Sequence, residues 1–275
     1  MSDFGSYKNK RVIITGCFSG MGEATARLLL QQGAEVHGLD YKECTLPLAS
    51  FGHVDLRDPA SIDAAVAKVG GKVDALFNCA GLPQTFPPVD VMKVNYIGAR
   101  RMTERVVPMM EPGSAIASIA STAGFGWSRR VPTIMELLSQ DTFEAAVKWC
   151  EGHLDTVAEG YSFSKEAMIV WTMMSGAHLI KRGIRINCIL PGPTETPMMK
   201  EFLSATDRSV IDAATQPINR RSKPEEQATA LVFLNSDAAS YVNGVAFPVD
   251  GGFMGGVATG QVDLSAMMGG AAAQH

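Results

Sequence analysis

The sequence predicts an α/β fold in which helices cover both faces of a doubly wound parallel sheet. Short apolar runs of strand length alternate with segments whose apolar residues recur at helical spacing. The strand-like runs contain too few polar residues to leave one face in water, which is typical of a parallel sheet. No stretch rich in proline and serine divides the 275 residues, so we expect a single domain over residues 1–275.

The first half of the chain begins with a β-branched run that a glycine ends, followed by a helical pattern that stops at Gly33. Further runs of the same two kinds follow as far as residue 110. The predicted strands cover residues 11–15, 35–39, 53–56 and 74–79. The predicted helices cover residues 22–32, 59–69 and 89–110.

The second half contains three predicted strands, at residues 114–121, 184–190 and 245–249. Helices are predicted at 161–182 and 224–234, and Pro224 opens the second where proline is favoured. Between the fifth strand and the helix at Tyr161 lies a helical insertion, residues 127–159, with helices at 132–139 and 142–150. The segment 255–275, rich in glycine, alanine and methionine, is predicted to be a flexible tail.

Composition excludes several classes of protein. The formal net charge of −4 provides no basic footprint for a nucleic acid or an anionic membrane. The five cysteines form no C-x-x-C pair and no cluster with the five histidines, so we expect no metal site, reduced thiols and a cytoplasmic location. No apolar run approaches the roughly 20 residues needed to cross a bilayer, so we expect no membrane partner.

A glycine-rich turn, Thr15-Gly-Cys-Phe-Ser-Gly-Met-Gly22, joins the first strand to the first helix. A dinucleotide site needs glycines there for a tight turn, for close approach of the backbone to the pyrophosphate, and for packing of helix on strand. The helix N-terminus offers unpaired N–H groups to the phosphates. The turn therefore predicts a Rossmann-type sheet, with a purely structural turn as the alternative. The predicted cofactor contacts in it are Gly16, Ser19, Gly20, Met21 and Gly22.

Asp40 ends the second predicted strand, 18 residues after Gly22. A carboxylate at this point accepts hydrogen bonds from the adenosine ribose and repels a 2′-phosphate. Neither arginine nor lysine occupies the glycine turn or position 41, although Lys42 is close. We therefore predict NAD as the cofactor, and the alternative role for Asp40 is that of a helix N-cap or a turn acid.

Tyr161 and Lys165 are four residues apart on a predicted helix, so their side chains share one face. Tyrosine is a poor base at neutral pH because its ordinary pKa is near 10. A neighbouring ammonium favours the tyrosinate, so we expect Lys165 to lower the pKa of Tyr161. The pair predicts acid–base chemistry on an alcohol or a carbonyl group, while a half-buried tyrosine beside a surface lysine is the alternative.

Together these motifs resemble those of the short-chain dehydrogenase/reductase (SDR) family over nearly the whole chain. The glycine turn matches the pattern TGxxxGxG, and Asn78-Cys-Ala-Gly81 matches the family's strand end. Asn95 and Ser121 stand where the family has its catalytic asparagine and serine. The segment Pro191-Gly-Pro-Thr-Glu-Thr196 matches the one that clasps the nicotinamide carboxamide. The chain is most similar to the branch of bacterial 3α-hydroxysteroid dehydrogenase/carbonyl reductase and coniferyl alcohol dehydrogenase.

The resemblance implies roles for the remaining site residues. The implied catalytic residues are Ser121, Tyr161, Lys165 and Asn95, the last of which would hold a water between Lys165 and solvent. Asp55 would meet the adenine amino group. Further implied cofactor contacts are Leu56, Asn78, Ala80, Gly81, Tyr161, Lys165, Pro191, Gly192, Thr194 and Thr196. For Ser121, Asn95, Asp55, Thr194 and Thr196, a cap, a bridge between backbone groups or a turn remains the structural alternative.

The insertion has two interpretations. It is either a substrate lid that carries Trp127, Met135, Leu138 and Trp149, or a helical cover over apolar surface that would otherwise join subunits. The resemblance implies a homodimer or homotetramer, but the spacing of 40 residues from Ser121 to Tyr161 departs from the family's pattern and puts its usual four-helix interface in question.

The expected function is an NAD(H)-dependent oxidoreductase that interconverts a secondary alcohol and a ketone on an apolar cyclic substrate. The alternatives are an aryl or allylic primary alcohol dehydrogenase and a non-catalytic NAD-sensing protein. Such sensors usually lack the tyrosine or the lysine, and this chain has Ser121, Tyr161 and Lys165 together.

Overall fold

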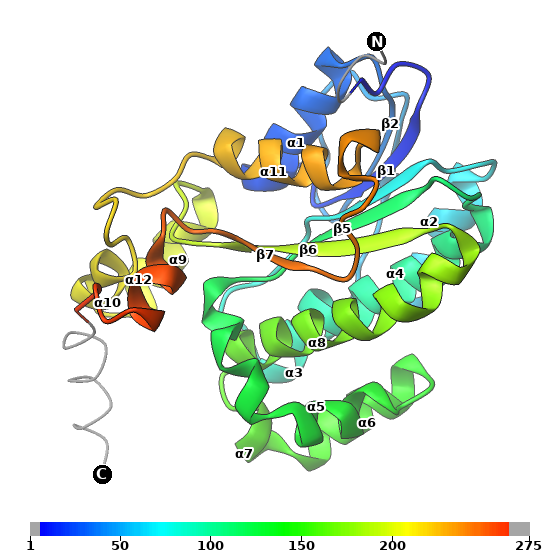
Figure 1. The fold of residues 1–275 in the computed structure, drawn as a ribbon. Coiled ribbons are helices and arrows are strands. Elements are labelled where there is room, and N and C mark those ends of the chain that lie inside the picture. The colour runs from blue at the N-terminus through cyan, green and yellow to red at the C-terminus, as the bar shows by residue number, and fades with distance from the viewer. Residues whose placement is uncertain (1–5, 264–275) are drawn as a thin grey trace.

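The computed structural model describes residues 6–263. Within that range, seven parallel strands form one sheet in the order β3-β2-β1-β4-β5-β6-β7 (Figure 1). The chain starts at β1, builds outward to β3, then returns to β4 and builds outward to β7, so the predicted doubly wound α/β class is confirmed. The strands are β1 (Arg11–Thr15), β2 (Glu35–Asp40), β3 (Ser50–His53), β4 (Ala75–Asn78), β5 (Ala115–Ile119), β6 (Arg185–Pro191) and β7 (Ala246–Val249).

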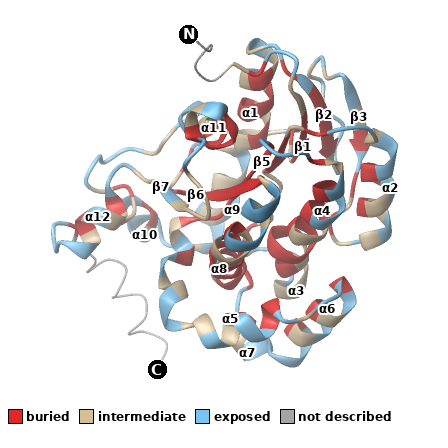
Figure 2. Cartoon of the chain, turned by 45° about the vertical axis from the view of Figure 1, so that its right-hand side comes forward, coloured by how far each residue is buried: buried red, intermediate tan, exposed pale blue. Residues whose placement is uncertain are grey.

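Helices cover both faces of this sheet. One face carries α1 (Gly20–Gln31) and α11 (Pro224–Asn235), which contact each other. The opposite face carries α2 (Pro59–Val69), α4 (Gly98–Val106) and α8 (Tyr161–Leu179), as Figure 1 shows. Strand residues alternate between two apolar clusters, so that Ile13 packs with one helical layer while Val12 and Ile14 pack with the other. Buried residues lie along the strands and the inward sides of the helices (Figure 2).

The third strand differs from the prediction. It covers Ser50–His53 rather than residues 53–56, and it pairs with β2 from His37↔Ser50 to Asp40↔His53. The prediction of a strand at residues 53–56 rested on the apolar residues Val54 and Leu56. Both are buried, but they follow β3. Pairing ends there because β2 itself ends at Asp40.

The helix predicted over residues 89–110 is built in four parts. α3 (Pro88–Met92) continues through a π-helical turn, Lys93–Ile97, into α4, and a short 3₁₀ turn follows. A side chain at Gly98 would place its Cβ 2.3 Å from the carbonyl oxygen of Leu56. Glycine therefore allows this helix to contact the loop after β3, and the π turn places Asn95 in a widened stretch of backbone.

The insertion folds as α5 (Val131–Leu138), α6 (Phe143–Gly152) and α7 (Leu154–Val157), of which α7 was not predicted. These helices contact α8 and α3, and Figure 1 shows them beneath α8. Leu137 and Phe143 are buried in the same apolar cluster as α8. Arg130 also pairs with the buried Glu166 of α8 at 3.3 Å. The insertion is therefore packed onto α8 as a cover.

Three helices gather beyond the carboxyl ends of β6 and β7: α9 (Pro197–Ala205), α10 (Arg208–Ala213) and α12 (Phe253–Ala258) (Figure 1). None of them was predicted. The start of the expected flexible tail is helical instead, because α12 packs through the buried Phe253 and Gly256. The rest of that expected tail, residues 264–275, lies outside the described residues. No helix within residues 6–263 is long and apolar enough to span a bilayer.

Candidate functional site

The glycine turn leaves no room for side chains at two of its positions. Gly16 has a φ of +75°, and a Cβ there would lie 2.6 Å from the backbone nitrogen of Ala80. A Cβ at Gly22 would lie 2.0 Å from the carbonyl oxygen of Gly16. Both distances are far inside van der Waals contact, so the close packing of α1 on β1 and β4 requires glycine. This is the role that the sequence predicted for them.

The N-terminus of α1 is open toward the carboxyl edge of the sheet. Ser19 is its N-cap residue in an extended conformation, but its side chain makes no capping hydrogen bond. Gly20, with a φ of +63°, faces the methyl group of Thr196. Met21 lines the cavity described below. The first N–H groups of this 12-residue helix therefore fit an anionic ligand such as a pyrophosphate.

Asp40 lies at the carboxyl end of β2, beside the glycine turn. Its carboxylate accepts hydrogen bonds from the backbone nitrogens of Phe18 and Lys42, each at 2.9 Å. The carboxylate thus acts as a turn acid, which was the alternative role. Its position one strand away from the turn is also the position expected of a ribose acceptor.

Asp55, Leu56 and Asn78 do not line the cavity. Asp55 forms a bidentate ion pair with Arg57, whose guanidinium holds the pKa of that carboxyl below its ordinary value. The side-chain nitrogen of Asn78 donates to Thr103 and to Ser118, deep between the sheet and α4. Its side chain is therefore committed to the core.

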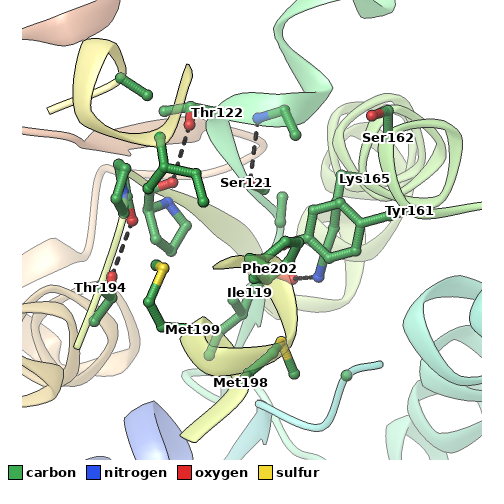
Figure 3. A pocket seen from close by; sticks show the side chains of 18 of the residues that line it. Ile119, Ser121, Thr122, Tyr161, Ser162, Lys165, Thr194, Met198, Met199 and Phe202 are labelled. Atoms are coloured by element: carbon green, nitrogen blue, oxygen red, sulfur yellow. Dashed lines mark hydrogen bonds between the residues drawn. The ribbon is translucent and has the colours of Figure 1, made fainter. Parts of the chain in front are cut away.

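Ser121, Tyr161 and Lys165 meet in one cavity of about 640 Å³ (Figure 3). Ser121 follows β5 directly, and its oxygen accepts a hydrogen bond from the backbone of Ala123, so it also caps the next turn. Tyr161 is the first residue of α8, and Lys165 lies one helical turn later. The three residues come from the carboxyl end of one strand and the start of one helix, as the sequence predicted.

The pKa of Tyr161 differs from the expectation. Burial raises it above its ordinary value, and a hydrogen bond with Ser121 offsets only part of that rise. Lys165 does not lower it, because its ammonium donates to the carbonyl of Ile119 at 2.9 Å and lies 5.4 Å from the centre of the tyrosine ring. Burial also lowers the pKa of Lys165 to about 8. The phenol is therefore protonated at neutral pH in this state of the site.

Asn95 is buried behind Lys165 and does not contact it through a hydrogen bond. Its side-chain amide accepts from the nitrogen of Leu82, donates to the oxygen of Leu82, and donates to Ser164. This is the bridging role that the sequence left open. A Cβ at Gly81 would lie 3.3 Å from the side-chain oxygen of Asn95 and 3.9 Å from Nζ of Lys165, so both groups lie near the same glycine.

The segment Pro191–Thr196, which we call the clasp, connects the two ends of the site. Thr196 lies against Gly20 at the start of α1. Thr194 lines the cavity near Tyr161, and its hydroxyl donates to the carbonyl of Gly192 at 2.9 Å. The predicted residues that line the cavity are Met21, Ala80, Gly81, Ser121, Tyr161, Lys165, Pro191, Gly192, Thr194 and Thr196.

The remaining walls of the cavity are mainly apolar. The ring of Phe202 in α9 packs edge-on against the ring of Tyr161, with 4.9 Å between centroids. Met198 and Met199, in the first turn of α9, also line the cavity (Figure 3). Lining residues that the sequence did not indicate include Phe125, Val210, Phe253, Met254 and Val257. In the sequence, these residues are marked only by apolar spacing within short segments.

The insertion contributes only its last residue, Glu159, to the lining of this cavity. Residues 127–158 all lie in the described range, and none of them lines it. Trp149 stacks instead on Phe163 of α8, with 6.0 Å between ring centroids. The structure therefore favours the helical cover over the substrate lid.

Comparisons with known proteins agree with this site. Residues 10–132 match a family described as short chain dehydrogenase, and residues 152–254 match one described as Enoyl-(Acyl carrier protein) reductase. The chain is 35% identical over 245 residues to a coniferyl-alcohol dehydrogenase of Pseudomonas sp. (strain HR199 / DSM 7063), covering 89% of this chain and 96% of that one. It is 31% identical over 248 residues to a 3-alpha-hydroxysteroid dehydrogenase/carbonyl reductase of Comamonas testosteroni, covering 88% and 95%.

A solved structure is similar over its whole length. The 3-alpha-hydroxysteroid dehydrogenase from Pseudomonas sp. B-0831, complexed with NADH, superposes with a TM-score of 0.78 at 28% identity, covering 92% of this chain and 100% of that one. The family binds nicotinamide cofactors and acts on small molecules. This chain belongs to the short-chain dehydrogenase/reductase family and is an oxidoreductase related to coniferyl-alcohol and hydroxysteroid dehydrogenases.

Proposed function

We propose that this protein is an NAD(H)-dependent oxidoreductase that interconverts a secondary alcohol and a ketone on an apolar cyclic substrate. The observation that carries the proposal is the meeting of Ser121, Tyr161 and Lys165 in an apolar cavity beside an open helix N-terminus. A cavity of about 640 Å³ with aromatic and methionine walls suits a ring system rather than a short-chain alcohol.

Acid–base catalysis is assigned to Tyr161. In reduction its protonated phenol donates a proton to the carbonyl oxygen of the substrate. In oxidation the phenol must first give up its proton toward solvent, and as a tyrosinate it then accepts the proton of the substrate hydroxyl group. Ser121 donates a hydrogen bond to the same substrate oxygen and orients it. Proton transfer of this kind contributes roughly 10²–10⁴-fold to a rate. The nicotinamide cofactor supplies the acceptor or donor of hydride.

The chain's residues fit a dinucleotide. The glycine turn and the open start of α1 suit the pyrophosphate, and Asp40 suits the adenosine ribose. The carboxylate of Asp40 disfavours a 2′-phosphate, which is the basis for proposing NAD over NADP. We assign Asp55 to the adenine end, and the clasp and Lys165 to the nicotinamide end.

Lys165 and Asn95 are proposed to connect Tyr161 with solvent. Both side chains lie near Gly81, where the absence of a Cβ leaves room beside the ammonium. The ammonium donates to Ile119, and two further N–H groups remain for the ribose and for a water that Asn95 holds. This route would resupply the proton that Tyr161 gives up in reduction.

Turnover assays test the proposal directly. Absorbance of NADH is followed with purified protein and a panel of steroid, cyclic and aryl alcohols and ketones, each with NAD(H) and with NADP(H). We expect turnover of cyclic secondary alcohols with NAD. Failure to bind either dinucleotide, measured by the fluorescence of the reduced cofactor, would remove the proposal.

An aryl or allylic primary alcohol dehydrogenase is the second candidate. The 35% identity to a coniferyl-alcohol dehydrogenase exceeds the 31% identity to the hydroxysteroid enzyme, and this favours it. The same panel separates the two, since coniferyl alcohol would then give a higher kcat/KM than any steroid. The assembly we propose is a homodimer or homotetramer, which light scattering measures.

A further inference from the structure

Gln227 is a buried amide that the sequence left without a role. It lies in α11 and has none of its surface exposed. Its side-chain nitrogen donates to Ser222 at 2.9 Å and to the carbonyl oxygen of Val249 at 2.9 Å. Its side-chain oxygen is buried and has no hydrogen-bond partner among the described residues. Burying an unpaired polar atom is costly, so the two bonds that the nitrogen donates are the ones that can tie this amide to the site.

The donors and acceptors around Gln227 can be assigned from chemistry. The hydroxyl of Thr194 lies 2.9 Å from the carbonyl oxygen of Gly192, which only accepts, so Thr194 donates there. In the 2.8 Å contact between Thr194 and Ser222, the serine is then the donor. A longer contact of 3.4 Å joins Ser222 to the carbonyl of Pro193. The bonds therefore run in one direction, from Gln227 through Ser222 and Thr194 to Gly192, and such chains reinforce one another.

Backbone hydrogen bonds tie the same two segments together. The nitrogen of Ser222 donates to the oxygen of Pro193, and the nitrogen of Glu195 donates to the oxygen of Ser222, each at 2.9 Å. Thr194 and Ser222 thus pair as an isolated parallel bridge. Ser222 is held in turn by Gln227, which also reaches the last residue of β7. The clasp therefore depends on a buried side chain of a helix that does not itself line the cavity.

The location of the clasp indicates what it meets. One end lies against Gly20, where α1 is open to phosphate, and the other end lines the cavity with Tyr161. The part of a dinucleotide between its pyrophosphate and the reacting carbon is the nicotinamide riboside. We propose that Gln227 and Ser222 are positioning residues that hold the clasp in the geometry that receives this half of the cofactor. This inference rests on the proposed function.

Two ligands separate this role from general stability. NADH carries the nicotinamide base, while ADP-ribose has the same adenosine, pyrophosphate and second ribose without that base. Gln227→Met keeps most of the side-chain volume and removes both donors. We expect the Kd of this variant for NADH, measured calorimetrically, to rise about tenfold while its Kd for ADP-ribose stays within about twofold of the wild type.

Ser222 provides the second variant and a rescue. Ser222→Ala should also raise the ratio of the Kd for NADH to the Kd for ADP-ribose. Ser222→Thr retains the hydroxyl and should restore this ratio toward the wild-type value. If Gln227→Met does not fold, Ser222→Ala is judged by the same ratio. The matched control is Asn235→Leu, which removes another buried amide donor of α11 whose partner is Leu76 in β4, away from the clasp. It should lower stability and leave the ratio unchanged.

The outcomes are distinct. The inference is overturned if the Gln227 and Ser222 variants lose affinity equally for NADH and ADP-ribose, or lose affinity for neither. A wild-type protein that binds neither NADH nor ADP-ribose would remove the proposed function itself. A ratio that rises in Asn235→Leu as much as in Gln227→Met would show that any loss of a buried amide in α11 disturbs the clasp, and would also overturn it.

Discussion

The proposed site has two ends, one assigned to the cofactor and one to the substrate, and they are built in opposite ways. At the cofactor end, the backbones of Gly16 and Gly22 approach so closely that no Cβ fits at Gly22. At the substrate end, none of the residues of α9, all of them described, is buried, and the wall consists of side chains such as Phe202. Backbone contacts fix the first end, whereas exchangeable apolar side chains shape the second. The cofactor end should therefore tolerate no enlargement, while the substrate end should accept changes that alter specificity.

The largest effect is expected where the two ends meet, at Tyr161. Tyr161→Phe removes the proton donor and acceptor and keeps the ring that packs on Phe202. We expect kcat to fall by about 10²–10⁴-fold, with little change in the Kd for NADH. Stopped-flow and steady-state assays measure both quantities. Tyr241→Phe, at a fully exposed tyrosine, is the control. Unchanged turnover in Tyr161→Phe would mean that another group transfers the proton.

Gly22→Ala should weaken cofactor binding and leave the substrate end of the site unchanged. Its methyl group would lie 2.0 Å from the oxygen of Gly16, so α1 must move away from β1. We expect the affinity for NADH to fall by about 100-fold, because displaced N–H groups no longer meet the pyrophosphate. Gly255→Ala is the control, since a Cβ there contacts no described atom within 4 Å. Wild-type affinity for ADP-ribose in Gly22→Ala would contradict the assignment of the turn.

Lys165 places a titrating group at the boundary between the two ends. Burial lowers its pKa from the ordinary 10.5 to about 8, so between those values the unfolded chain binds more protons at this residue than the folded chain. Through this group the free energy of unfolding rises as pH increases from about 8 to 10.5, by at most roughly 3 kcal/mol. Urea titrations of the wild type and Lys165→Met measure it. The variant should lack this rise. If the free energy of unfolding has the same slope against pH in both proteins, the assignment is contradicted.

Asp40→Asn should change the preference between NAD and NADP without abolishing cofactor binding. The amide oxygen can still accept one of the two backbone hydrogen bonds, but the negative charge is lost. We expect the ratio of kcat/KM for NADP to that for NAD to rise about tenfold, because repulsion of the 2′-phosphate is removed. Asp141→Asn, at an exposed loop residue, is the control. A falling ratio would indicate that Asp40 does not face the ribose.

The smallest effect is expected at the substrate end. Phe202→Ala removes an aromatic wall that contacts the ring of Tyr161. We expect KM for a polycyclic secondary alcohol to change about fivefold while kcat for cyclohexanol stays within about twofold, because only the larger substrate reaches that wall. Leu203→Ala, the exposed neighbour outside the cavity lining, is the control. Equal losses for both substrates would show that Phe202 supports catalysis rather than specificity.

The same contrast explains how much of the molecule could be predicted from the sequence. The glycine turn and Ser121 were predicted because each comes just after the end of a strand. The Tyr161–Lys165 pair was predicted because both residues lie at the start of one helix, where helical spacing determines their relative position. By contrast, Met254 and Val257 line the cavity only because α12 folds back from β7. That contact joins segments far apart in sequence, and short apolar stretches do not indicate it.

The pKa of Tyr161 could not be predicted for a similar reason. Helical spacing correctly placed Lys165 one turn away, but the direction of the shift depends on burial and on the carbonyl of Ile119. Asp55 and Asn78 show the same limit, since their partners, Arg57 and Thr103, are set by the packing of loops and helices. A motif gives the position of such a residue along a strand but not the direction of its side chain.

The position of α12 has a practical consequence for handling the protein. Phe253, Met254 and Val257 line the cavity, so a chain shortened to end before α12 would lack part of the cavity wall. The described chain enters the sheet at β1, the third strand from the β3 edge, and none of residues 6–15 lines the cavity. Protein for ligand screening should therefore keep α12 intact and carry any tag at the amino end.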